Sequence, residues 1–221
     1  QEGVVRADRL VAGEDGAITL VASGPVRSVG TLSAQRGDIT VSSEGDIEVG
    51  GAATAKDGTV TMAAGKDLTV AASTSTAGTT TLKANKNLKV NANLTNDSGN
   101  LTLAADSDLD GQGSYLQAAG TTVATTTSGD ITIASSGAST LASVSSAGSL
   151  TLKQAGAAAT YTQHAGSSVK TAGGLTIEPG VTLQAGTTLY EVGRDWVNLG
   201  AFDPGASSVW LTGPDPATTA V

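Results

Sequence analysis

The sequence predicts an all-β protein, a parallel β-helix (β-solenoid) with about 20 to 21 residues per coil and three short strands in each coil. Three observations lead to this fold. A phrase that begins with glycine recurs every 20 or 21 residues. Apolar and polar residues alternate with a period of two, as in a strand with one buried face. The chain holds 29 glycines and only 3% aromatic residues, so its core must consist of small side chains in a regular frame.

The repeated phrase predicts the first strand of each coil. It is GAITL at residue 16, GDITV at 37, GTVTM at 58, GTTTL at 78 and GNLTL at 99, so its starts differ by 21, 21, 20 and 21 residues. The glycine marks a corner at which a side chain would obstruct a tight bend. The two apolar residues of each strand, such as Ile18 and Leu20, should face the core. The threonines between them should face outward: Thr19, Thr40, Thr61, Thr81 and Thr102.

A second predicted strand follows in each coil. Its apolar residues Ile47, Leu68, Leu88 and Leu109 are 21, 20 and 21 residues apart, in step with the first phrase. Because the two series of residues repeat with the same spacing, we expect these four residues to stack in one buried column, with coils about 4.8 Å apart. Nine such coils would form a rod roughly 40 Å long.

The later coils are irregular. The coil at 120–147 has 28 residues and the coil at 148–172 has 25, and we expect the extra residues to bulge outward. The phrases GSLTL at 148 and GGLTI at 173 restore the pattern, so residues 1–192 are predicted to be one solenoid with bulged coils at 120–172. Residues 193–221 are expected to be an aromatic-rich final coil, cap or assembly segment.

Four of the six aromatic residues of the chain lie near its end: Tyr190, Trp196, Phe202 and Trp210. The last coil of a solenoid exposes unpaired backbone and core, so large rings are suited to closing it. The alternative is that these rings bind carbohydrate by stacking.

The segment DSDLDGQG at 106–113 has the beginning of a calcium loop, with Asp106, Asp108 and Asp110 at alternate positions and Gly111 sixth. The spacing of the repeat predicts an ordinary strand at this segment instead. It places Leu109 in the buried column, on a strand that would hold the three acids in a row about 6.8 Å apart, too extended to surround one ion. Position twelve is Gln117, where such a loop supplies a glutamate. We therefore favour an ordinary strand without a cofactor and keep as the alternative a calcium ion shared between neighbouring coils.

Composition excludes several classes of function. Twelve Lys and Arg against 20 Asp and Glu give a net charge of −8, which argues against nucleic acid and anionic membranes as partners. No run approaches the roughly 20 apolar residues of a spanning helix. Cysteine is absent, which removes disulfides, thiol catalysis and thiolate metal sites. The single histidine, His164, has no acidic neighbour in sequence, and no G-x-S-x-G surrounds a serine, so we expect no catalytic residues and no enzyme.

The outward threonines suggest a second hypothesis. Thr59 with Thr61 and Thr79 with Thr81 would lie on successive coils in a flat array, an arrangement that can order water on ice. Asp38 and other residues interrupt the array, and threonine is common on strands for ordinary reasons. A flat face that binds ice or glycan is therefore the alternative function.

The phrases GDITVSSEGDIEVGG, GTVTMAAGKDLTVAA and GNLTLAADSDLDGQG resemble the repeats of the filamentous haemagglutinin family of secreted bacterial adhesins. The resemblance covers residues 16 to about 190. It implies a right-handed β-helix that is exported across the outer membrane and displayed at the bacterial surface as a long fibre, often to adhere to a host or to a surface glycan or protein. The segment WVNLGAFDPGASSV resembles a motif near the ends of repetitive bacterial surface proteins.

The function expected from these observations is a non-enzymatic extracellular rod, either a segment of an adhesin or a subunit that stacks on itself head to tail. Open coil ends offer backbone donors, backbone acceptors and core surface, and a head-to-tail contact that does not close into a ring propagates as a fibre. The N-terminal QEGVVRADRL, with Val4 and Val5, and the segment after Val209 should then meet across subunits, one chain's strand completing the sheet of the other.

Overall fold

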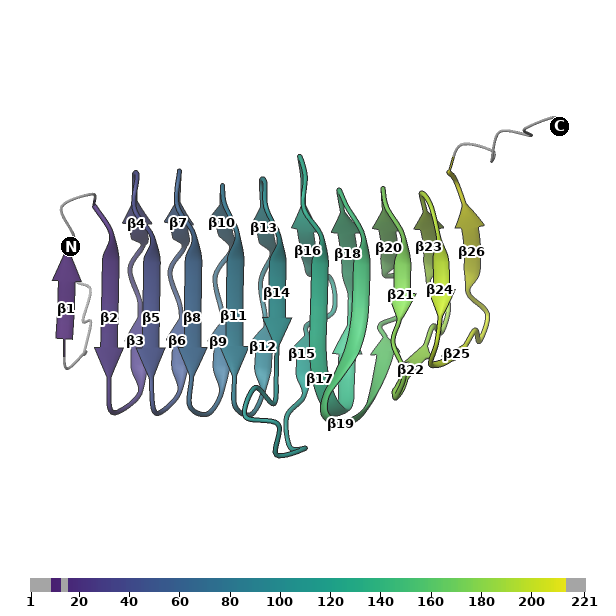
Figure 1. Ribbon diagram of the computed structural model, residues 1–221, viewed down its shortest axis with the longest axis horizontal. Helices are drawn as coiled ribbons and strands as arrows, with labels where there is room; N and C mark the ends of the chain where they lie inside the picture. Colours follow the sequence, from purple (N-terminus) through teal and green to yellow (C-terminus); the bar gives the residue numbers. More distant parts are fainter. Residues whose placement is uncertain (1–8, 13–15, 214–221) are drawn as a thin grey trace, which may run out of the picture.

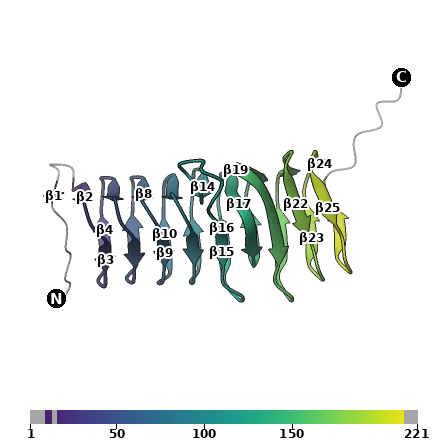
Figure 2. The same ribbon diagram turned by 90° about the horizontal axis from the view of Figure 1, so that it is seen from below.

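The computed structural model describes residues 9–12 and 16–213. These residues form 26 strands, and the strands stack in nine coils along a rod (Figure 1). The first described strands lie at one end of the rod and β24, β25 and β26 lie at the other (Figures 1 and 2). The predicted all-β solenoid is confirmed. The described part of the chain contains no helix long and apolar enough to cross a membrane.

Each regular coil places one strand on each of three faces. The first face consists of β2 (Ile18–Ala22), β5 (Ile39–Ser43), β8 (Val60–Ala64), β11 (Thr80–Ala84), β14 (Leu101–Ala104), β21 (Leu175–Ile177) and β24 (Trp196–Asn198). The second consists of β3 (Val26–Ser28), β6 (Ile47–Val49), β9 (Leu68–Val70), β12 (Leu88–Val90), β15 (Tyr115–Gln117), β22 (Val181–Gln184) and β25 (Ala201–Asp203). The third consists of β4 (Leu32–Ala34), β7 (Ala53–Ala55), β10 (Thr74–Thr76), β13 (Leu94–Asn96), β16 (Thr122–Thr125), β18 (Ser143–Ser146), β20 (Ser168–Thr171), β23 (Leu189–Val192) and β26 (Ser208–Leu211).

The strands of successive coils pair in parallel, so equivalent residues lie directly beside one another. Ile47 pairs with Leu68 and Leu68 with Leu88, and all three are buried, which confirms this part of the predicted core column. The predicted outward threonines also share one column, which continues through three further coils. Its eight members are half-buried: Thr19, Thr40, Thr61, Thr81, Thr102, Thr132, Thr151 and Thr176.

Polar residues at several corners link one coil to the next. The Asp38 carboxylate accepts hydrogen bonds from the backbone N–H of Thr59 at 2.7 Å and from its hydroxyl at 2.9 Å. At the next corner the Asp46 carboxylate accepts the N–H of Asp67 at 3.0 Å. The bonds from Thr59 hold the pKa of Asp38 below its usual value, the backbone bond having the larger effect. An acid before the strand therefore satisfies a backbone donor that the corner would otherwise leave unpaired.

The fifth coil corrects the predicted column at Leu109. The partner of Leu88 is Tyr115, which is completely buried, whereas Leu109 is 63% exposed. Residues 105–114 between β14 and β15 form a loop that leaves the regular outline of the rod (Figure 1). The prediction was wrong because the sequence DLD in this loop is similar to the corner sequences of earlier coils. The similarity gives no sign that extra residues are inserted before β15.

The sixth and seventh coils contain two long strands, β17 (Ile131–Leu141) and β19 (Leu150–Gln163), that run over both the first and the second face. Their pairing register shifts: Ser135 lies opposite Gln154, but Gly137 lies opposite Ala159. Residues 155–158 of β19 therefore face Ser136 alone, and this segment, which we call the β19 bulge, is largely exposed. Residues 194–213 continue the parallel stack as the ninth coil.

Candidate functional site

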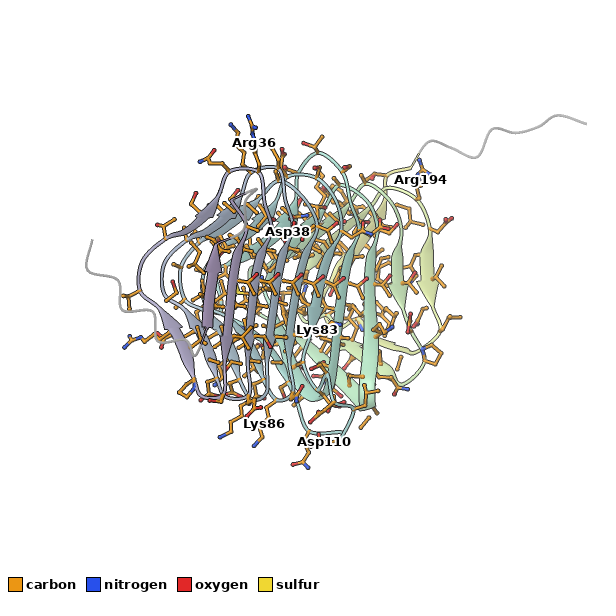
Figure 3. The ribbon with its side chains drawn as sticks, turned by 60° about the vertical axis from the view of Figure 1, so that its left-hand side comes forward. Arg36, Asp38, Lys83, Lys86, Asp110 and Arg194 are labelled. Atoms are coloured by element: carbon orange, nitrogen blue, oxygen red, sulfur yellow. The ribbon has the colours of Figure 1, made fainter. Side chains whose placement is uncertain are left out.

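The structure brings the three acids of the 106–113 loop together instead of spacing them along a strand. Asp106 and Leu109 adopt positive φ angles of 56° and 63°, and Gly111 has a φ of 84°, so the backbone curls. One carboxylate oxygen from each of Asp106, Asp108 and Asp110 lies within 4.8 Å of the others. The expectation of an extended row was wrong, because it depended on Leu109 being a core residue. Asp110 lies on the loop where it projects from the rod (Figure 3).

Asp106 anchors this loop to two later coils. Its side chain is completely buried, and its carboxylate accepts hydrogen bonds from the Ser136 hydroxyl, from the N–H of Gly156 at 3.0 Å and from the N–H of Gly111 at 3.1 Å. Gly156 lies in the β19 bulge, where an added Cβ would be 2.6 Å from the backbone of Leu109. The loop and the β19 bulge therefore pack against each other and bury Asp106 between them. The three hydrogen bonds compensate for the burial of its charge.

The electrostatics of Asp106 agree with this anchoring role. Burial alone raises the pKa of its carboxyl, but the hydrogen bonds, led by the one from Ser136, outweigh burial and hold the pKa below its usual value. Asp108 and Asp110 are exposed, and Asp110 accepts the N–H of Gln112 at 2.8 Å. Calcium binding by these three acids remains a prediction.

We expect Asp106→Asn to lower the free energy of unfolding by about 1.5 to 3 kcal/mol at neutral pH, because a neutral amide replaces a charged acceptor of three donors. The folded pKa lies below the unfolded one, so the contribution of Asp106 is present above the unfolded pKa and is lost as pH falls through the folded value. The gap between wild type and variant in denaturant titrations should therefore shrink below about pH 4. Asp108→Asn, an exposed change on the same loop, should stay within about 0.5 kcal/mol at every pH.

His164 has a structural contact. Its Nε2 lies 3.0 Å from the carbonyl oxygen of Gln117 and donates to it, which ties the seventh coil to the fifth. The hydroxyl of Ser167 donates to the backbone carbonyl of His164 at 2.6 Å and so does not engage the imidazole ring.

Three of the four predicted rings form a cluster at the C-terminal end of the rod. Trp196 and Phe202 meet edge to face with centroids 4.9 Å apart, and Tyr190 lies 5.8 Å from Trp196 and 6.0 Å from Phe202. Edge-to-face contacts of this kind stabilise aromatic clusters. Trp210 lies elsewhere, at an outward position of β26 beside Glu191, where it is 58% exposed.

The three rings do not cover the whole end of the core. Val209 and Leu211 pair with Tyr190 and Val192, so they occupy inward positions, yet they are 39% and 64% exposed. Val197 and Leu199 of the same coil are 37% and 61% exposed. Among the described residues, five of the eight exposed large apolar side chains belong to the ninth coil: Val197, Leu199, Val209, Trp210 and Leu211. We call these five residues the end patch; of the five, only Trp210 is predicted from the sequence as a cap or assembly residue.

The backbone is also open at both ends. Within the described residues, β24, β25 and β26 each pair on one side only, with β21, β22 and β23. At the other end β3 and β4 likewise pair only with β6 and β7. The edge of β2 is different, because β1 (Arg9–Ala12) pairs with it in antiparallel orientation. Val4 and Val5, predicted to take part in assembly, lie outside the described residues.

The first face shows how far the threonine array extends. The column of eight threonines is continuous, but the neighbouring outward position holds threonine on only two coils, as Thr59 and Thr79. On the other coils of this face that position holds Ala17, Asp38, Asn100, Asp130, Ser149, Gly174 and Asp195. Charged residues lie at the corners on both sides of the face, with Arg36 and Arg194 along one edge and Lys86 along the other (Figure 3).

Comparison with known proteins adds no relative. No family model matches the chain, and no curated protein and no solved structure shows significant similarity to it.

Proposed function

We propose that this protein is a non-enzymatic extracellular rod that serves as a segment of an adhesin or as a filament subunit by end-to-end stacking. The observation that carries the proposal is the end patch, where one coil exposes five large apolar side chains next to three unpaired strand edges. Monomeric proteins usually avoid such an edge, because apolar surface together with free backbone donors and acceptors promotes association. A further coil on this end would pair the three strand edges and cover the inward side chains of Val209 and Leu211.

The other features fit a scaffold better than an enzyme. Asp106, the buried acid among the described residues, holds a loop in place, and the only histidine of the chain donates to a backbone carbonyl. The resemblance of the repeats to filamentous haemagglutinins supports a place outside the cell and at the bacterial surface. It also supports a host or surface glycan or protein as the target of adhesion.

The alternative function is a flat-face binding module for ice or glycan. The eight-threonine column favours it, because methyl and hydroxyl groups repeat at the spacing of parallel strands, about 4.8 Å. Under this alternative Thr81→Lys should abolish inhibition of ice recrystallisation or binding in a glycan array. Under the rod proposal the same variant should leave assembly unchanged.

Negative-stain microscopy of the protein at increasing concentration tests the rod. We expect fibres with an axial repeat of about 40 Å, the length of nine coils. Leu211→Asp should remove the fibres, because it places a charge in the end patch. Leu109→Asp is the matched control: Leu109 is 63% exposed and Leu211 is 64% exposed, but Leu109 lies on the loop, so its variant should form fibres like wild type. Single rods at every concentration would rule out self-assembly.

A further inference from the structure

One outward column of the second face carries opposite charges at its two ends. It begins on the first coil with Arg27 and, followed through the pairing register, ends on the ninth coil with Asp203. The column consists of Arg27, Glu48, Thr69, Lys89, Leu116, Thr140, Thr162, Gln184 and Asp203. A copy stacked in the same register would therefore bring Asp203 of one molecule next to Arg27 of the following one.

The chain already uses this kind of contact between its own coils. Arg27 and Glu48, neighbours in the column, form an ion pair of 3.1 Å, and on the third face Lys170 pairs with Glu191 at 3.1 Å. The charges of the end coils are also complementary. Residues 16–36 contain two arginines and no acid, whereas residues 194–213 contain two aspartates and one arginine.

A second polar column points to the same register. On several coils of the first face the corner residue accepts a backbone N–H from the following coil, as Asn100 does from Asp130 at 3.0 Å and Asp130 does from Ser149 at 2.7 Å. Asp195 is the last member of this column, because Trp196 pairs with Leu175. A following coil would offer the N–H of its own Ala17 to Asp195.

The strand β1 decides how two copies can meet. It pairs with β2 only and leaves the edges of β3 and β4 open. If β1 stayed in place, it would lie between β2 and β24 of the neighbouring copy. The extra strand would hold β3 and β4 one strand spacing too far from β25 and β26 of that copy to pair with them. If β24 takes the place of β1, all three faces join. The exchange breaks the pairing of β1, which has four residues. It forms the pairing of β24, β25 and β26, which have three, three and four residues.

We propose that the occupant of the end patch is the first coil of a second copy, stacked in direct register. In this junction β24 replaces β1 on the edge of β2, and Asp203 faces Arg27 of the next copy. The proposal rests on the proposed function, since it specifies the junction of the fibre. It assigns β1 the role of a cover that keeps the first coil from pairing until a neighbour displaces it.

The absence of cysteine allows a direct test by engineered disulfides. Cα atoms of in-register parallel neighbours lie about 4.8 Å apart, within the range that a disulfide spans. The full chain with Arg27→Cys and Asp203→Cys should give a ladder of dimers, trimers and larger species on a non-reducing gel after mild oxidation. The control, Arg27→Cys with Asp110→Cys, uses an exposed position on the loop, away from the junction, and should form fibres without a ladder. Fibres without a ladder from the first pair would overturn the junction while leaving the rod intact, whereas absence of fibres from the wild-type protein would overturn both.

A second pair of variants tests the displacement of β1. Thr19→Cys with Val197→Cys should also give a ladder, because these positions share the threonine column and meet only when β24 lies directly on β2. Conversely, Val11→Cys with Thr19→Cys joins paired residues of β1 and β2 within one molecule. The oxidised form of this variant should form no fibres, and a reducing agent should restore them. Fibres from the oxidised form would show that β1 stays in place.

A charge reversal tests the junction without disulfides. Asp203→Lys places a cation beside Arg27 of the neighbour and should raise the protein concentration at which fibres appear by roughly five- to tenfold. Asp110→Lys makes the same change of charge on the exposed loop and should have no effect. Equal effects of the two variants would mean that net charge, rather than the Asp203–Arg27 contact, governs assembly.

Discussion

Replacing Tyr161 with alanine is expected to lower the free energy of unfolding by about 3 to 5 kcal/mol, the largest single effect we anticipate. Tyr161 is completely buried in the seventh coil, between Ser139 and Leu183 of its neighbours. The backbone pairing of each coil fixes its distance from the next. The cavity therefore cannot collapse, and its full cost remains.

The hydroxyl group of Tyr161 adds a separate, smaller contribution. Its single proton is shared between the carbonyl oxygens of Ile133, at 3.1 Å, and Lys153, at 2.8 Å, and burial raises the pKa of the phenol, so it stays protonated. Tyr161→Phe keeps the ring and should cost only about 1 to 2 kcal/mol. Urea titration followed by circular dichroism measures both variants. A similar loss for the two would show that the hydrogen bonds, not the packing of the ring, stabilise this coil.

Gly129→Ala is expected to have the second largest effect, because two separate penalties meet at this corner. Gly129 has a φ of 109°, and an added Cβ would lie 1.9 Å from the carbonyl oxygen of Gly99 in the preceding coil. The backbone angle alone costs a non-glycine residue about 1 to 2 kcal/mol. The clash must in addition push two coils apart, at a further cost of about 1 to 3 kcal/mol.

Gly120→Ala separates these two penalties. Gly120 has a φ of 77°, but no heavy atom lies within 4 Å of the position that its Cβ would take. This variant should lose only the conformational part, about 1 to 2 kcal/mol. Hydrogen exchange at the amides of β14 and β17 should also rise in Gly129→Ala and not in Gly120→Ala. Equal losses of stability would contradict the argument from coil contact.

Much of the regular part of the rod could be predicted from sequence because its interactions repeat. Ile47, Leu68 and Leu88 occupy one column, and the threonines occupy another, as their spacing indicated. Each coil contacts mainly its two neighbours, so a period in the chain becomes a stack in space. Alternation along each strand then decides which side chains are buried.

The prediction failed where the repeat is interrupted. The phrase around Leu109 matches earlier corners and so predicts a core position, yet the loop is held by Ser136 and Gly156, 30 and 50 residues from Asp106. Partners so distant leave no local signal. Trp210 was grouped with the closing rings on composition alone, whereas its register beside Glu191 turns it outward.

The sequence by itself determined the coil, its period and the direction of each side chain in the regular strands, because these follow from short-range alternation. Only the tertiary structure decided where the insertion lies, and with it the pairing register of the second face beyond Leu88. The column from Arg27 to Asp203 becomes visible only after that register is known. The same holds for the end patch, whose inward residues are exposed because no described coil covers them, a consequence of position in the stack rather than of residue type.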